Sequence, residues 1–247
     1  MKKIFLYILV GTLALSSCKK DDEIETYKEP ENIAVQNDYD DQAIQKFMTD
    51  HYFDTQGNIK PFSVTDTIDD NYTKLKDTPG LEKLNSGVIV IPIQNAQPIN
   101  GTNIEDKDVL NILMKSQAYV ANQTAGVVSF EGGLTFVDNV NNSSMTLDPI
   151  FYYVKNSVLN AATTDAAKQR SYYEIEGFQE GIKKFKAFNL SNSAPYKMQG
   201  AIIVPSRAAY ARDASYYNSS TNSVRNRSFV FNFQVYKATT RDMNTED

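Results

Sequence analysis

The chain has 247 residues, a formal net charge of −5, one cysteine and one histidine. An acidic chain lacks the clustered lysine and arginine that bind nucleic acid, so we expect no nucleic-acid partner. A single cysteine excludes an internal disulfide and a cysteine metal site, and we expect neither a metal nor a cofactor.

Residues 1–17 have the pattern of a secretory signal peptide, in which two lysines precede an apolar run and small residues follow it. The run is shorter than the roughly 20 apolar residues that span a membrane. Its end, LALSSC, looks like a bacterial lipobox, which would make Cys18 the lipidated first residue of the mature chain. An ordinary signal peptide with an incidental cysteine is the alternative.

Residues 18–40 are charged and carry few apolar side chains, so we expect a flexible acidic tether. An N-terminal extension, residues 41–82, should follow, with one amphipathic helix over residues 41–53 and mostly loop after it. We expect His51 to be packed on that helix, because no second histidine exists to pair with it as a metal ligand. The residues that share the apolar face are Ile44, Phe47, Met48 and His51.

β-branched and aromatic runs predict the strands of a domain over residues 83–240, ahead of a C-terminal tail at 241–247. The segment 109–121 fits a strand or a helix by its periodicity alone. Alternation of phenylalanines in 228–236 predicts a half-buried terminal strand, and 156–170 has some helical potential. The other strand signals are 87–93, two pieces about Gly132-Gly133 within 127–137, 150–154, and 200–204.

The stretch 171–210 is predicted to lie at the centre of this domain. Phe178, Ile182 and Phe185 fall on one face of a short helix at about 177–188. Its two glycines lower its intrinsic helix propensity, so packing against the apolar strands must hold it.

No sequence signal of a familiar catalytic site is present. The chain has no GxSxG elbow, HExxH, CxxC or glycine-rich phosphate loop, and Asp69-Asp70 is typical of a solvated turn. Because the chain has 15 tyrosines and 13 phenylalanines, we expect its functional site to be an apolar cleft lined with aromatic side chains.

Three motifs carry a resemblance to a known family: I-x-G-F-x-E-G-I, A-I-I-V-P-x-x-x-A-Y and S-F-V-F-x-F-x-V. Together they resemble the second half of an FKBP-type peptidyl-prolyl isomerase domain, and more narrowly the lipid-anchored FKBP-like proteins of the Bacteroidetes group. The resemblance covers about 175–237, and 87–173 only loosely. It implies an α+β fold in which an FKBP-like antiparallel sheet wraps around one short helix, with a helical N-terminal extension. It also implies a strand in the second half of 109–121.

The resemblance implies a pocket for a proline-containing peptide. Phe178 stands at the aromatic floor, and Phe231 at the position that closes the pocket. The backbone N–H of Ile175 would meet the ligand carbonyl, and the hydroxyl of Tyr210 would bond the substrate. Further substrate-binding counterparts from the first half are Tyr119, Phe136 and Asp138.

The sequence departs from the family near this pocket. Ala211 follows the pocket tyrosine where glycine is usual, and Arg225 and Arg227 replace a proline-bearing tip. The loop before them carries Tyr216 and Tyr217. These departures put catalysis in doubt more than fold.

Prolyl isomerisation suits such a cleft, since it forms no covalent bond with the protein and needs no acid or base. Its barrier of ~18–20 kcal/mol is rotation about the peptide C–N bond. The twisted amide is less polar than the planar one, so a water-poor pocket favours it.

Two functions follow from the sequence. One is a lipid-anchored envelope isomerase or folding helper acting on proline-containing peptides or unfolded envelope proteins. The alternative is a non-catalytic FKBP-like binding or structural lipoprotein. An open cleft with Tyr210, Phe178 and Phe231 converging would favour the first. A cleft filled by Arg225, Arg227 or the Tyr216-Tyr217 loop would favour the second.

The same features predict the place of the protein in the cell. A lipid on Cys18 would anchor it in the outer membrane, facing either the periplasm or the cell surface. The acidic run after Cys18, Lys20-Asp21-Asp22-Glu23, is similar to the export signal of Bacteroidetes surface lipoproteins. A solvated periplasmic spacer would have the same composition.

Overall fold

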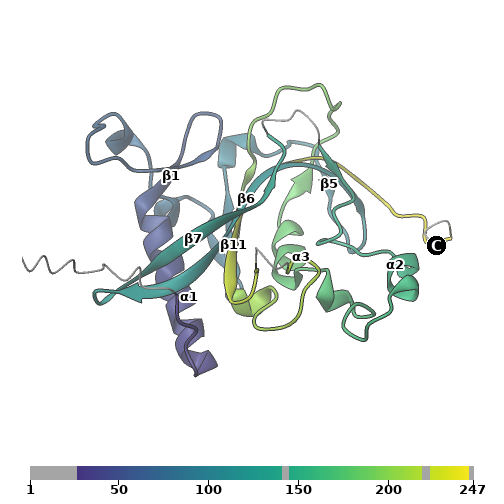
Figure 1. Cartoon of the computed structure of the whole chain (residues 1–247). Coiled ribbons are helices and arrows are strands. Elements are labelled where there is room, and N and C mark those ends of the chain that lie inside the picture. The colour runs from purple at the N-terminus through teal and green to yellow at the C-terminus, as the bar shows by residue number, and fades with distance from the viewer. Residues whose placement is uncertain (1–26, 141–144, 219–222, 245–247) are drawn as a thin grey trace, which may run out of the picture.

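The computed structural model describes residues 27–140, 145–218 and 223–244. In these ranges a seven-stranded sheet has helix α1 (Ile33–Asp50) on one face and helix α3 (Glu176–Ile182) on the other (Figure 1). We call the α3 side the inner face and the α1 side the outer face. An antiparallel sheet around one short helix, with a further helix at the N-terminus, confirms the expected α+β class.

The sheet runs β3-β4-β10-β11-β6-β7, and β8 pairs with the beginning of β6. Two small two-stranded sheets, β1-β2 and β5-β9, flank it. The bounds are β1 His51–Phe53, β2 Ile59–Pro61, β3 Glu82–Lys83, β4 Ile89–Pro92, β5 Thr102–Asn103, β6 Val109–Thr124, β7 Val127–Asp138, β8 Thr146–Leu147, β9 Lys186–Ala187, β10 Gly200–Val204 and β11 Arg227–Thr239.

Strand β11 is the last in sequence but lies at the centre of the sheet, between β10 and β6. Its alternating phenylalanines point into the inner core with α3, as the pattern predicted. The expectation of a half-buried strand was wrong, because the second face of β11 is buried too: Val230 is 5% exposed, Asn232 4% and Gln234 3%. Val230 packs there with Ile44 and Met48 of α1.

The central helix α3 is shorter than the predicted 177–188. The chain turns after Ile182, yet Phe185 still reaches the inner core and packs on Phe233 with 4.9 Å between ring centroids. Glycine allows the helix to lie close to the sheet: a Cβ on Gly181 would sit 2.8 Å from the Cγ2 of Ile202. Packing therefore holds a helix that has little propensity of its own. The other helical pieces are α2 Asn156–Ala161 and the 3-10 turns η1 Asp69–Asn71, η2 Leu75–Asp77, η3 Gln94–Ala96, η4 Arg170–Tyr172 and η5 Ser206–Ala208.

Helix α1 begins eight residues before the predicted start. The side chain of Asn32 caps it by accepting from the backbone N–H of Ala34 at 2.8 Å. Residues 33–40 are therefore helical and not part of a tether, and Gln36 and Asp40 are buried. The sequence pattern did not predict a helix over 33–40, because the side chains that this segment buries are polar. Residues 18–26 of the predicted tether, and Cys18 with the signal peptide, lie outside the described residues.

Three further strand predictions needed correction. The whole of 109–124 is one strand, so the ambiguous segment is β throughout. β7 is a single strand with register shifts rather than two short strands about Gly132-Gly133. The run 150–154 forms turns and no strand. Within the described ranges, the helices are too short or too polar to cross a membrane.

Candidate functional site

The four residues predicted to form the pocket come together in the inner core. Phe178 on α3 and Phe231 on β11 are in contact, with 4.6 Å between ring centroids. Ile175 is the N-terminal cap residue of α3, and Tyr210 follows the 3-10 turn after β10. All four belong to one apolar cluster with the inner strands.

The two groups that would hold a peptide are already bonded inside the protein. The backbone N–H of Ile175 donates to the carbonyl oxygen of Phe151 at 2.8 Å. The hydroxyl of Tyr210 donates to the carbonyl oxygen of Tyr173 at 2.6 Å. Burial raises the pKa of Tyr210, so its phenol stays neutral and serves as a donor. Neither donor is free to meet a ligand.

Further aromatic side chains pack against Phe178, Phe231 and Tyr210. Phe151 packs on Phe178 and Phe231 at centroid distances of 5.2 and 5.9 Å. Tyr217 packs on Phe136 at 4.6 Å and on Tyr210 at 5.9 Å. Phe178 and Phe231 have no exposed surface, and Tyr210 is only 2% exposed. The site is closed.

The segment 148–154, which we call the plug, carries Phe151 into this space. Asp148 begins it with a left-handed φ of +56° and is paired with the guanidinium of Arg241, one bond being 2.8 Å. The ring of Tyr153 lies between two guanidinium groups, 4.7 Å from that of Arg170 and 4.2 Å from that of Arg241. Sequence reasoning missed the plug; the Asp148-Pro149 pair, a common start of a turn, was the available signal.

A second acidic anchor holds the far end of the plug. Glu174 is 8% exposed and accepts from the backbone N–H of Val154 at 2.8 Å. The same carboxylate accepts from Arg170 at 2.9 Å. The plug is thus bonded at its beginning, at Phe151 and at its end.

The first-half candidates divide between the two faces of the sheet. Phe136 lies at the pocket, 5.0 Å from Phe229 between ring centroids. Tyr119 lies on the outer face, where it stacks on Phe130 at 5.2 Å. Asp138 pairs directly with Lys115 across the β6-β7 ladder, so it belongs to the same outer side. The structure does not bring Tyr119 and Asp138 to Phe178 and Tyr210, since the pleats of β6 and β7 turn these two positions toward the outer face.

The two arginines expected near the pocket mouth serve other contacts. Arg225 forms a two-pronged ion pair with Glu29 at 2.7 and 2.9 Å, which holds residues 27–32 against the loop after Tyr210. Arg227 donates to the carbonyl oxygen of Ala118 at 3.0 Å. Of the side chains expected to fill the cleft, Tyr217 does so, whereas the two arginines and the exposed Tyr216 do not.

Helix α1 ends at Asp50, three residues before the predicted end, so His51 begins strand β1 and its side chain is partly buried. Its ring stacks on Phe47 with centroids 3.9 Å apart, and its Nδ1 lies 2.9 Å from the carbonyl oxygen of Phe47. Burial lowers its pKa. In the portion of the chain that the structure describes, no group of three or more His, Cys, Asp or Glu side chains could hold a metal ion.

Comparisons with known proteins give little beyond a distant structural match. No protein-family model matches the chain, and no curated protein matches it. Among solved structures, it is similar to the 1.6 Å crystal structure of a peptidyl-prolyl cis-trans isomerase from Pseudomonas syringae pv. tomato str. DC3000. The match has 10% identity and a TM-score of 0.35, and covers 87% of this chain and all of that one. A likeness this distant says nothing about the chemistry of the site.

Proposed function

We propose that this chain is an FKBP-like domain that acts by binding rather than by isomerising prolyl bonds. One observation carries the proposal. The two donors expected to bind a peptide, Ile175 N–H and Tyr210 O–H, already donate to backbone carbonyl oxygens within an aromatic core. A buried donor that is already bonded gains nothing from a ligand unless its present partner leaves. Isomerisation in this pocket would first require the plug to move.

A second candidate function is an isomerase that is active only when the plug is displaced. The convergence of Phe178, Phe231 and Tyr210 favours it, because the pocket walls are in place behind the plug. Phe151 and Tyr217, which close the site, come from connecting segments and not from the strands that form the walls. Its substrate would be a proline-containing peptide or an unfolded envelope protein.

Exchange spectroscopy by NMR on Xaa-Pro peptides separates the two candidates. The purified full-length chain should give no acceleration of cis-trans exchange. A Phe151→Ala, Tyr217→Ala variant that accelerates exchange would support the second candidate. Tyr216→Ala is the matched control, since this neighbouring tyrosine is 54% exposed. Acceleration by the unaltered chain, lost in Tyr210→Phe, would overturn the proposal.

We propose further that the protein is a lipoprotein of the outer membrane. The support is the sequence alone: a signal-like segment, a lipobox-like LALSSC and Cys18. Labelled palmitate should enter the unaltered protein and not a Cys18→Ala variant, which should also leave the membrane fraction. Protease treatment of intact cells would then distinguish the cell surface from the periplasmic face. Labelling that survives Cys18→Ala would refute the anchor.

A further inference from the structure

A groove lies on the outer face of the sheet, beyond the part that α1 covers, and we call it the outer groove. Its volume is about 580 Å³, within the range of pockets that hold small ligands. The end of α1 and the β1-β2 hairpin form one wall, and β6 and β11 form the floor. The residues that carry the argument are Lys60, Lys115, Gln117, Tyr119, Val230 and Asn232.

The wall of the groove is fixed to its floor by buried hydrogen bonds. Asn232, 4% exposed, donates to the carbonyl oxygen of Gly57 at 3.0 Å and accepts from the backbone N–H of Ile59 at 3.3 Å. The carbonyl oxygen of Gln56 accepts from the backbone N–H of Met198 at 2.8 Å. Gly57 makes this close approach possible, since it has φ +82° and an added Cβ would lie 2.8 Å from the carbonyl oxygen of Met198. The groove is therefore formed before any ligand binds.

The lining of the groove carries two lysines and one carboxylate, and Asp138 stands opposite Lys115 across the β6-β7 ladder, outside the lining. Among the ion pairs of the described residues, none uses Lys60 or Lys115. Asp54, the carboxylate in the lining, is held by the side chain of Asn58 at 3.0 and 3.2 Å. Burial lowers the pKa of His51, so the two lysines supply the positive charge at neutral pH.

The floor has the spacing of an extended chain. Lys115 and Gln117 are alternate residues of β6 on the same face, about 6.8 Å apart, which is also the repeat of alternate side chains in a bound extended peptide. Tyr119, the next residue of β6 on this face, adds an aromatic ring, whereas Val230 in the lining is only 5% exposed. Two lysines beside an aromatic ring suit a carboxylate-bearing peptide better than an uncharged ligand.

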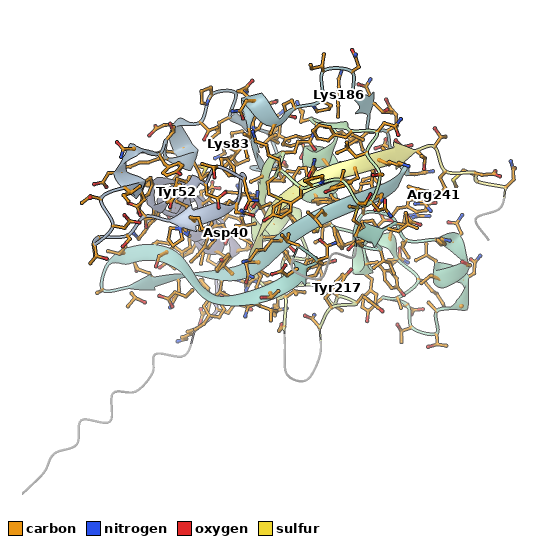
Figure 2. The ribbon with its side chains drawn as sticks, turned by 90° about the horizontal axis from the view of Figure 1, so that it is seen from above. Asp40, Tyr52, Lys83, Lys186, Tyr217 and Arg241 are labelled. Carbon is orange, nitrogen blue, oxygen red and sulfur yellow. The ribbon has the colours of Figure 1, made fainter. Side chains whose placement is uncertain are left out.

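We propose that the outer groove binds an extended peptide segment whose acidic side chains meet Lys60 and Lys115. The proposal deepens the binding role proposed above and rests on it. It assigns that role to the face opposite the closed pocket. Tyr52 of the hairpin and Arg241, which is paired with Asp148 of the plug, lie toward opposite ends of the molecule (Figure 2). The groove and the plug can therefore be altered separately.

An amide-resolved NMR titration of the full-length chain tests this proposal. The probes are acetyl-Glu-Ala-Glu-Ala-amide, its counterpart with lysine for glutamate, and succinate. The glutamate peptide should give saturable shifts at the amides of Lys115, Gln117 and Asn232, and the lysine peptide none. Succinate should bind at least tenfold more weakly than the glutamate peptide. Equal affinity for succinate would overturn the peptide assignment in favour of a small-anion site.

Matched charge variants complete the test. Lys60→Gln with Lys115→Gln should weaken binding of the glutamate peptide at least tenfold. Lys186→Gln with Lys237→Gln removes the same charge outside the groove and should change the affinity for the glutamate peptide less than twofold. Equal weakening by both pairs, or no saturable shift in the unaltered chain, would overturn the proposal. Prolyl exchange catalysed by the chain would contradict the proposed function without altering these titrations, so the two failures are distinguishable.

Discussion

At the scale of single residues, a buried carboxylate joins α1 to the 3-10 turn that follows β10. Asp40 is fully buried near the middle of the molecule (Figure 2). It accepts from the side chain of Gln36 at 2.9 Å and from the backbone N–H of Ser206 at 2.9 Å. Desolvation by burial raises its pKa, against the lowering effect of these hydrogen bonds. Its polar partners reduce the cost of burying the charge without removing it.

This burial predicts a pH dependence of stability. Because the folded-state pKa of Asp40 is raised, its contribution to stability is full below the ordinary value of 3.8 and is lost as pH rises through the folded-state pKa. Asparagine stays neutral, so the free energy of unfolding of the unaltered chain relative to Asp40→Asn should fall as the pH rises above about 4. Urea unfolding at several pH values measures this. A difference that is constant or rises with pH would contradict the burial cost, and exposed Asp38→Asn is the control.

The hydroxyl of Tyr210 is a second residue-scale test. In the closed site it is a structural donor, and its loss leaves the buried carbonyl of Tyr173 without this partner. Tyr210→Phe should therefore lower the free energy of unfolding by about 1–3 kcal/mol. The measurement is chemical denaturation. An unchanged stability would indicate that the hydroxyl is free to meet a ligand.

At the scale of elements, α1 is a packed part of the fold. Ile44 is 2% exposed against the outer face, whereas Val35 on the same helix is 39% exposed. Ile44→Ala should lower the free energy of unfolding by about 2–5 kcal/mol. Val35→Ala should change it by less than about 0.5 kcal/mol. Similar small effects from both would mean that the helix is a detachable extension.

At Gly177 of α3, helix propensity and packing against the sheet predict opposite effects of an alanine substitution on stability. Alanine at Gly177 would gain up to about 1 kcal/mol of helix propensity. Its Cβ, however, would lie 2.5 Å from the Cγ1 of Val204 and 2.8 Å from the carbonyl oxygen of Ala208. We expect Gly177→Ala to lower the melting temperature, because overpacking costs about 1–3 kcal/mol. A raised melting temperature would show that the contact is loose.

At the scale of the whole molecule, local patterns predicted much of the fold. The alternation in β11 and the apolar face of α3 were visible in the sequence, and both face the inner core. The central place of β11 was not, because strand order depends on pairings between distant segments. The outer cover by α1 was only partly visible, since its first turns bury Gln36 and Asp40 instead of apolar side chains.

In the candidate site too, short motifs were visible in the sequence and contacts between distant segments were not. A resemblance over three short motifs was enough to bring Phe178, Phe231 and Tyr210 together. It gave no indication of the plug, whose position depends on Asp148, Glu174 and two arginines that are separate in sequence. Tyr119 lies on the outer face and not at the pocket, because a shift of one residue along β6 exchanges the two faces of the sheet.

The central claim, that the pocket is closed, is tested most directly by native-state hydrogen exchange at the amide of Ile175. This N–H donates a hydrogen bond to the carbonyl oxygen of Phe151, and Ile175 has no exposed surface. We predict that it exchanges with the same opening free energy as the central amides of β10 and β11, which report global unfolding. Exchange through an opening that costs at least ~2 kcal/mol less than global unfolding would contradict the account, because it would show that the plug leaves the pocket while the fold stays intact.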